Sequence, residues 1–217
     1  MIQKVRKGEE LDEVNIKKYL YKNQFITDKN SELIIEQFSN GFSNLTYLLK
    51  IEKKELVLRC PPNGAVKYGH DMSREFKVLK GLNKGFEKAP KAHLFTNDID
   101  IIGAPFYIME KIEGIILSRK EANIRNICAE DYQKIACNWL DTFVELHELD
   151  YKKMGLEDLG KPNGYVERQV KNWSKQYLRA ATEEIPESYK IMEWLVKNQP
   201  STHTYSLIHN DYKYDNV

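Results

Sequence analysis

The sequence contains no long run of hydrophobic residues, which argues against a membrane-spanning protein. Its longest apolar stretch, residues 99–109, is interrupted by Asp100, Gly103 and Pro105. That stretch falls well short of the ~18 consecutive apolar residues expected of a membrane-spanning helix. Residues 1–10 are largely charged and lack the apolar centre of a secretion signal. We therefore expect neither a membrane partner nor export.

Cysteine is scarce, and the charges of the two signs nearly cancel. Cys60, Cys128 and Cys137 are the only cysteines, and no two of them form a Cys-x-x-Cys pair. This usage argues against a disulfide framework or a zinc site and fits the reducing cytoplasm. The 33 Lys and Arg residues exceed the 32 Asp and Glu residues by one, so the basic surplus of a nucleic-acid binder is missing. We expect a cytoplasmic protein with a small-molecule substrate; the oligomeric state stays open.

The first half of the chain is predicted to be rich in strands. Short apolar segments alternate there with turn-forming residues, and a helical spacing of Met72, Phe76, Leu79 and Leu82 interrupts them once. The predicted strands are residues 33–38, 45–51, 56–59, 93–95 and 106–109, with a turn at Lys53-Lys54 and helices over residues 11–22 and 71–83.

The second half of the chain follows a helical pattern. Apolar residues between positions 132 and 144 recur at the i, i+3, i+4, i+7 spacing of an amphipathic helix. Residues 165–180 and 187–198 are two further candidate helices. The short apolar segment 206–208 is predicted to be a strand that leads directly into His209.

Length and composition favour two lobes. A chain of 217 residues with 41% hydrophobic residues can form one large domain or two small lobes. We predict an α+β fold with an antiparallel-sheet lobe at residues 1–112 and a partial helical lobe at residues 113–217. A cleft between two lobes is a common place for a small-molecule site.

The last nine residues carry the sharpest chemical signal. Residues 209–217 fit the pattern His-x-Asp-x-x-x-x-Asn of a phosphotransferase catalytic loop. Asp211 is placed to orient an attacking hydroxyl and accept its proton, and Asn216 offers an amide oxygen to Mg²⁺. Lys213 is placed to neutralise charge on the transferred phosphoryl group, whereas His209 is expected to brace the loop. A polar surface turn is the simpler alternative.

A cation and a carboxylate in the first half form the second signal. Arg59 ends a predicted strand, and Glu75 lies on the helix that follows. Kinases hold nucleotide phosphates with a strand cation that a helix Glu orients, and arginine can grip phosphate oxygens with two nitrogens. Taken singly, the two residues read as an ordinary surface arginine and glutamate. Combined with the catalytic loop, they favour a nucleotide clamp in which both charged groups lie together.

Two weaker signals complete the predicted ATP site. The turn containing Gly41, Ser43 and Asn44 lies between two strands, where backbone N–H groups can approach phosphates. The segment that leaves the last strand offers the backbone of Glu110 and Ile112 to adenine. Each feature also has a plain structural explanation, as a simple hairpin turn and as a strand leaving the core.

Three segments, together with the catalytic loop, resemble one known family. They are Val57-Leu58-Arg59-Cys60-Pro61-Pro62, His70-Asp71-Met72-Ser73-Arg74-Glu75-Phe76 and Ile102-Gly103-Ala104-Pro105-Phe106-Tyr107-Ile108-Met109-Glu110. The chain is similar over residues 31–217 to the aminoglycoside-phosphotransferase/choline-kinase superfamily. Within it, the chain most resembles the kinase-like domains found alone in bacteria or fused to acyl-CoA dehydrogenases.

The resemblance implies a protein-kinase-like bilobal fold, ATP with Mg²⁺ as cofactors, and transfer to a small-molecule hydroxyl such as that of a hydroxyacyl-CoA. It also implies a second Mg²⁺-binding Asp and further helices beyond Val217, so we expect a truncated helical lobe and little phosphoryl transfer by this chain. Asn210 stands where the family often has Gly. The alternatives are a pseudokinase module that binds nucleotide or acyl-CoA without catalysis, and a domain that has only kept the fold.

Overall fold

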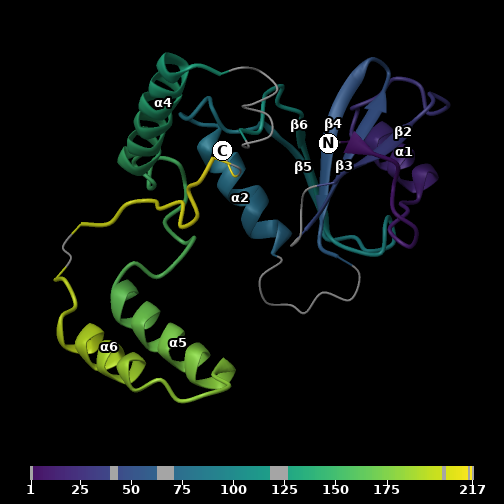
Figure 1. Ribbon diagram of the computed structural model, residues 1–217. Helices are drawn as coiled ribbons and strands as arrows, with labels where there is room; N and C mark the ends of the chain where they lie inside the picture. Colours follow the sequence, from purple (N-terminus) through teal and green to yellow (C-terminus); the bar gives the residue numbers. More distant parts are fainter. Residues whose placement is uncertain are drawn as a thin grey trace.

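Antiparallel strands form a single sheet in the order β1-β2-β3-β4-β6-β5. The computed structural model describes residues 2–39, 44–62, 71–117, 127–201, 204–214 and 216. Figure 1 shows the sheet on one side of the molecule and three helices of the second half on the other. The strands are β1 (Ile2–Gln3), β2 (Ile34–Phe38), β3 (Leu45–Ile51), β4 (Lys54–Cys60), β5 (Ala92–Thr96) and β6 (Phe106–Glu110).

The hairpin of β3 and β4 is the longest ladder of the sheet, with pairs from Leu45↔Cys60 to Ile51↔Lys54. Its turn is Glu52-Lys53, whose φ angles are 47° and 63°. Positive φ at both central residues is typical of a two-residue turn that matches the twist of the strands. The predicted turn at Lys53-Lys54 was therefore one residue late, because Lys54 already pairs with Ile51.

Helix α1 (Glu13–Lys22) covers part of the sheet and contributes to the main core. Its N-cap is Asp12, whose carboxylate accepts the N–H of Asn15 at 2.9 Å, which satisfies one of the free N–H groups of a first turn. Ile16 and Leu20 are completely buried. Together with the inward side chains of β3 and β4, they form the hydrophobic centre of the sheet-containing part.

Helix α2 (Met72–Leu82) lies between the sheet and the helices of the second half (Figure 1). The helix begins after Asp71, whose side chain accepts the N–H of Arg74 at 3.0 Å and so caps the first turn. Phe76 stacks on Phe95 of β5 with ring centroids 5.5 Å apart, so one side of α2 packs on the sheet. The predicted helix over residues 71–83 is confirmed.

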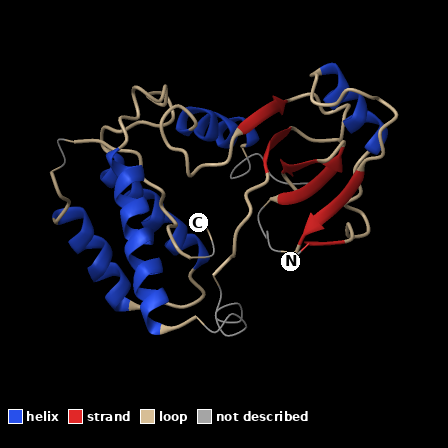
Figure 2. Cartoon of the chain, turned by 90° about the horizontal axis from the view of Figure 1, so that it is seen from above, coloured by secondary structure: helices blue, strands red, loops and turns tan. Residues whose placement is uncertain are grey.

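The second half is helical, as predicted, with α4 (Ala129–Glu148), α5 (Tyr165–Ala180) and α6 (Pro186–Lys197). Figure 2 shows these helices separated from the strands, which confirms the α+β class. Two details differ from the sequence prediction: β1 was not foreseen, and residues 206–208 form no strand. The boundary after residue 112 stays a prediction. No helix in the described ranges is long and apolar enough to cross a membrane.

Candidate active site

Arg59 and Glu75 are in direct contact. The Nε atom of Arg59 lies 2.9 Å from Oε2 of Glu75, and about one third of each side chain is exposed. The distance is that of an ion pair, although the angle at Nε falls short of a hydrogen bond. The pairing that we predicted for these two residues is therefore present, with Arg59 near the end of β4 and Glu75 on the first turns of α2.

Two further side chains hold the Glu75 carboxylate in place. Asn44 is buried and donates its Nδ2 to Oε1 of Glu75 at 2.8 Å. The hydroxyl of Tyr107 donates to Oε2 at 2.9 Å, and Tyr107 is the cross-strand partner of Arg59. Burial and the nearby Glu75 charge raise the pKa of the Tyr107 hydroxyl, so this group stays a proton donor. Both oxygens of Glu75 are thus occupied, while about one third of the Arg59 side chain stays exposed.

The predicted catalytic residues form a second cluster. Nδ2 of Asn216 donates to Oδ2 of Asp211 at 2.7 Å and to the Asp211 carbonyl at 3.0 Å. Nζ of Lys213 lies 3.8 Å from the same Oδ2 atom. The loop therefore brings together one carboxylate, one amide and one ammonium group. The amide nitrogen of Asn216 makes both contacts. The side-chain carbonyl oxygen of Asn216 accepts no hydrogen bond from the described residues, so it can bind a ligand.

Aromatic contacts attach this loop to α4. The ring of Tyr212 lies 4.4 Å from that of Trp139 and 5.0 Å from that of Phe143, measured between centroids. Its hydroxyl donates to the Trp139 carbonyl at 2.7 Å. The N–H of His209 donates to Nε2 of His147 at 3.2 Å. His209 thus braces the loop, as expected, but through its backbone and the edge of its ring against Tyr212.

Burial and the neighbouring His209 lower the pKa of His147, which favours the neutral imidazole that accepts this bond. His147 therefore has a structural role, since it holds the start of the catalytic loop.

The backbone conformation of Asn210 shows how asparagine can stand where the family often has glycine. Its φ angle is 68°, a left-handed conformation that glycine adopts freely and that asparagine tolerates better than most other residues. Its Oδ1 atom accepts the hydroxyl of Tyr165 at 3.3 Å. The tight bend before Asp211 is therefore kept with a side chain in place of a hydrogen atom.

The segment after β6 contains backbone N–H groups that are free to bind a ligand. The N–H of Glu110 donates to the Lys91 carbonyl at 2.9 Å, and its carboxylate accepts the N–H of Lys91 at 2.8 Å. Ile112 is exposed, and within the described residues its N–H has no hydrogen-bond acceptor. Of the two predicted adenine contacts, Ile112 therefore has the freer N–H group.

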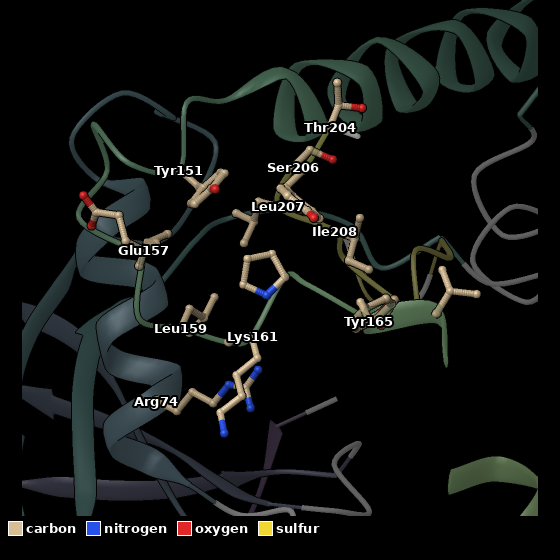
Figure 3. A pocket seen from close by; sticks show the side chains of 16 residues that line it. Arg74, Tyr151, Glu157, Leu159, Lys161, Tyr165, Thr204, Ser206, Leu207 and Ile208 are labelled. Carbon is tan, nitrogen blue, oxygen red and sulfur yellow. Dashed lines mark hydrogen bonds between the residues drawn. The ribbon is translucent and has the colours of Figure 1, made fainter. Parts of the chain in front are cut away.

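A cavity of about 350 Å³ lies between α2, the segment of residues 151–166 and the chain that leads into the catalytic loop. Its walls are mainly apolar, and its volume lies within the range of ligand pockets. Arg74 and Lys161 extend toward the same side of the cavity, whereas the Glu157 carboxylate points away from them (Figure 3). The lining includes Tyr151, Leu156, Leu159, Tyr165, Leu207, Ile208 and Asn210.

The sequence neighbours of one residue from each cluster line the cavity, although Glu75 and Asp211 themselves do not. Arg74 precedes Glu75 on α2, and Asn210 precedes Asp211, and both line the same cavity. Of the other predicted residues, Gly41 and Ser43 lie outside the described residues, and Asn44 contacts Glu75. No cluster of three or more His, Cys, Asp or Glu side chains suited to a metal occurs in the described part of the chain.

Sequence reasoning missed Tyr107 and Arg74. The alternation of β6 could have indicated Tyr107, because the residue that pairs with Arg59 on an adjacent strand shares its face of the sheet. Nothing in the sequence indicated Arg74, whose role depends on where residues 151–166 lie.

Comparison with known proteins agrees with this arrangement. The phosphotransferase enzyme family (APH) matches residues 34–217. Human acyl-CoA dehydrogenase family member 11 is 34% identical over 203 residues, which are 91% of this chain and 26% of that protein. Mouse acyl-CoA dehydrogenase family member 10 is 31% identical over 214 residues, which are 98% of this chain and 20% of that protein. The chain thus spans about a quarter of the length of these curated relatives or less.

Solved structures show the same fold. A Ralstonia eutropha JMP134 protein, provisionally described as an aminoglycoside phosphotransferase, has a TM-score of 0.80 and 28% identity, over 96% of this chain and 60% of that one. Ethanolamine kinase of Plasmodium vivax has a TM-score of 0.50 and 15% identity, over 89% of this chain and 59% of that one. The predicted kinase-like bilobal fold is thereby confirmed. Since the matched residues include the ion pair, the catalytic-loop cluster and the lining of the cavity, the chain belongs to the phosphotransferase enzyme family.

Proposed function

We propose that this chain carries the phosphotransferase site of an ATP-dependent kinase that acts on the hydroxyl group of a small molecule. The observation that supports this most is a cavity lined by Arg74 and Asn210, which precede Glu75 and Asp211 in the sequence. A phosphotransferase needs a held nucleotide on one side and an aligned acceptor on the other. A cavity whose lining includes the sequence neighbours of Glu75 and Asp211 is suited to that need.

The residues present supply part of a site for Mg²⁺ and ATP. The amide oxygen of Asn216 is a hard donor of the kind that Mg²⁺ prefers, and Arg59, whose side chain is about one third exposed, suits phosphate oxygens. When bound, ATP supplies the phosphoryl group and Mg²⁺ neutralises part of its charge. Ile112 would hold adenine through its backbone, and Arg59, oriented by Glu75, would hold the phosphates.

Asp211 would do the proton chemistry. Its carboxylate would accept a hydrogen bond from the acceptor hydroxyl, align the oxygen and take its proton as the oxygen–phosphorus bond forms. Asn216 holds the carboxylate through Oδ2 at 2.7 Å, which fixes its direction. Lys213, near the same oxygen, would offset negative charge on the group in transfer.

The cavity supports an acceptor with an apolar part and an anionic group. Its walls contain Leu159 and Ile208, and its two cations are Arg74 and Lys161. This lining is consistent with the hydroxyacyl group of a hydroxyacyl-CoA, the substrate class that the resemblance suggested. The volume of about 350 Å³ suits an acyl group, with the larger remainder of such a substrate outside.

Replacement of Asp211 by Asn tests the proposal. ADP release is measured with MgATP and a panel of hydroxyacyl-CoAs, amino alcohols and aminoglycosides, in this chain and in longer proteins that contain it. We expect little turnover by this chain alone. In the longer proteins, Asp211→Asn should lower turnover by ~10²–10⁴-fold, the usual contribution of a positioned base, with ATP affinity largely kept. Asp141→Asn, which changes an exposed carboxylate on α4, should have no effect.

The outcomes separate the alternatives. Turnover that survives Asp211→Asn would remove Asp211 from the mechanism. ATP binding without turnover on any acceptor would favour the non-catalytic module. Absence of any nucleotide binding would favour a domain that has kept the fold alone.

A further inference from the structure

The side of α2 that faces away from the sheet carries an unusually close contact at Gly81. A Cβ atom at this position would lie 2.7 Å from Cδ2 and 2.8 Å from Cγ of Leu156. Leu156 itself is 2% exposed. Its side chain therefore rests directly on the α2 backbone, in a space that only glycine leaves open.

The segment that carries Leu156 is folded for this contact. The carboxylate of Asp150 accepts the N–H of Lys152 at 3.0 Å, and the N–H of Leu156 returns to the Tyr151 carbonyl at 2.9 Å. Gly155 has a φ angle of 73°, which turns the chain sharply just before Leu156. These bonds form a tight turn that presents Leu156 to α2.

An ion pair and a second glycine contact extend the same interface. Nζ of Lys77 lies 2.5 Å from Oδ1 of Asp158, and Lys77 is one helical turn from Gly81, so both face residues 150–158. A Cβ atom at Gly85 would lie 2.9 Å from Cε of Met154. The segment of residues 150–158 thus contacts α2 at Lys77 and Gly81, and the turn after α2 at Gly85.

The interface also reaches the catalytic loop. Leu82 and Leu146 are buried in one hydrophobic cluster, against which Leu79 and Leu207 pack. Leu207 lies two residues before His209. The side of α2 that meets the helical lobe is therefore continuous with the chain that carries Asp211.

We infer that Leu156 and Gly81 are positioning residues that hold α2 so that Glu75 reaches Arg59. This inference rests on the proposed role of the Arg59–Glu75 pair as the nucleotide clamp. A helix rises about 1.5 Å per residue, so Gly81 lies about 9 Å along α2 from Glu75, within the same rigid rod. A shift of the helix at Gly81 moves the Glu75 carboxylate relative to the β4 strand, which is fixed in the sheet.

A double-mutant cycle without nucleotide tests the coupling itself. Glu75→Gln removes the charge that pairs with Arg59 and should lower the melting temperature Tm by several degrees in the wild-type chain. In the Leu156→Ala background we expect less than half of this shift, because the pair is already displaced. Residues that act through one another show such non-additive effects, whereas independent sites add.

Leu20→Ala is the matched control. It also removes a buried leucine side chain, 0% exposed, but from α1 and away from the α2 interface. Glu75→Gln should keep its full Tm shift in this background. Equal Glu75→Gln shifts in the Leu156→Ala and Leu20→Ala backgrounds would overturn the inference, whether or not the chain binds nucleotide.

Nucleotide affinity gives the second arm, measured by titration with MgATP. Leu156→Ala should weaken binding about 5–10-fold, because only the fraction of molecules with α2 in place is competent, whereas Leu20→Ala should leave the affinity unchanged at temperatures where it is folded. If the wild-type chain binds no MgATP, the proposed function is wrong. The double-mutant cycle, which needs no nucleotide, then still tests whether Leu156 and Gly81 position α2.

Gly81→Ala provides a second variant that keeps Leu156. The added methyl group meets the Leu156 side chain and should displace α2, with the same loss of the Glu75→Gln shift. The double variant Gly81→Ala with Leu156→Ala removes this clash but also the packing of Leu156, so its Glu75→Gln shift should equal that in Leu156→Ala alone. A further loss of the shift when Gly81→Ala is added to Leu156→Ala would show that the two residues do not act through each other.

Discussion

At the residue scale, the carboxylate of Glu75 is the most constrained charged group of the site. It contacts the guanidinium of Arg59, the amide of Asn44 and the hydroxyl of Tyr107. Three contacts, from β4, from β6 and from the residue before β3, leave this carboxylate little freedom, so the position of Arg59 is fixed in turn. The exposed part of Arg59 is therefore preorganised, which lowers the entropic cost of binding a phosphate.

Loss of this cation should weaken nucleotide binding. A hydrogen bond to a charged group contributes ~1.5–3 kcal/mol, and the partial exposure of Arg59 argues for the lower end, so we expect Arg59→Gln to lower MgATP affinity about 10-fold. Lys50→Gln breaks a comparable surface pair with Glu36 on β2 and β3 and serves as the matched control. Isothermal titration of both variants checks this, and equal affinities would exclude Arg59 from the nucleotide site.

Glu52 gives the chain an acid-sensitive contact. Its carboxylate accepts the N–H groups of Asp28 and Thr27 at 2.7 and 2.9 Å, and these bonds lower its pKa from 4.5 to about 2. A group with a lowered folded pKa stabilises the fold fully above its unfolded pKa, and the stabilisation is lost as the pH falls toward the folded value.

The Glu52 contribution should therefore disappear between about pH 4.5 and pH 2. Glu52→Gln should lower the urea midpoint near neutral pH and flatten its dependence on pH across that window. Urea unfolding at several pH values, with the wild type and Glu52→Gln compared, measures this. Parallel pH profiles of the two proteins would show that Glu52 is not the group that titrates.

At the element scale, the segment before the family match is part of the fold. The match begins at residue 34, yet α1 contributes Ile16 and Leu20 to the main core, and both are completely buried. The strand β1 pairs with β2 through Ile2↔Phe38. Residues 2–33 therefore cover the sheet and close one of its edges.

Truncation of a core residue in α1 should be costly. Leu20→Ala removes a buried side chain, and such changes cost ~2–5 kcal/mol because of lost burial and the cavity that remains. Val14→Ala, on the exposed side of the same helix, is the control and should change little. Denaturant unfolding of the two variants decides the matter: a small loss for Leu20→Ala would mean that α1 is only loosely attached.

Much of this architecture was readable from periodicity. The predicted α5, residues 165–180, agrees with the structure at both ends, because strong amphipathic spacing and Gly164 mark it. Neither β1 nor the missing strand at residues 206–208 could be foreseen, since two-residue pairing and irregular backbone depend on partners distant in the sequence. Arg59 and Glu75 were predictable as a pair because a strand and the next helix pack together.

The sequence could not reveal how the site is braced. Tyr107 and Asn44 hold Glu75 only because β6 lies beside β4 and because β3 begins at the same end of the sheet. Leu156 is distant in sequence from Gly81, and their contact depends on a turn built from backbone bonds. Such contacts between elements carry no local pattern, whereas the catalytic loop is recognisable from its own nine residues.

At the scale of the whole molecule, α2 belongs to both lobes. One side of the helix packs on the sheet through Phe76 and Phe95, and another meets Leu156 and the cluster around Leu146. A ligand that fixes Arg59 and Glu75 therefore also fixes the helix on which the helical lobe rests. We expect the two lobes to unfold together and to respond together to nucleotide.

This expectation leads to a thermal-shift experiment. A ligand that binds only the folded state adds ~2.7 kcal/mol of stability at a concentration of 100 Kd. In a chain of this length each kcal/mol raises the Tm by roughly 2–4 °C, so MgATP should raise a single transition by about 5–10 °C.

For Arg59→Gln with about 10-fold weaker binding, the same MgATP concentration adds only ~1.4 kcal/mol, so the shift should fall by about half. Lys50→Gln should keep the full shift. Two separate transitions, of which MgATP raises only one, would show that α2 does not couple the lobes, and no shift at any MgATP concentration would favour a domain that has kept the fold without the nucleotide site.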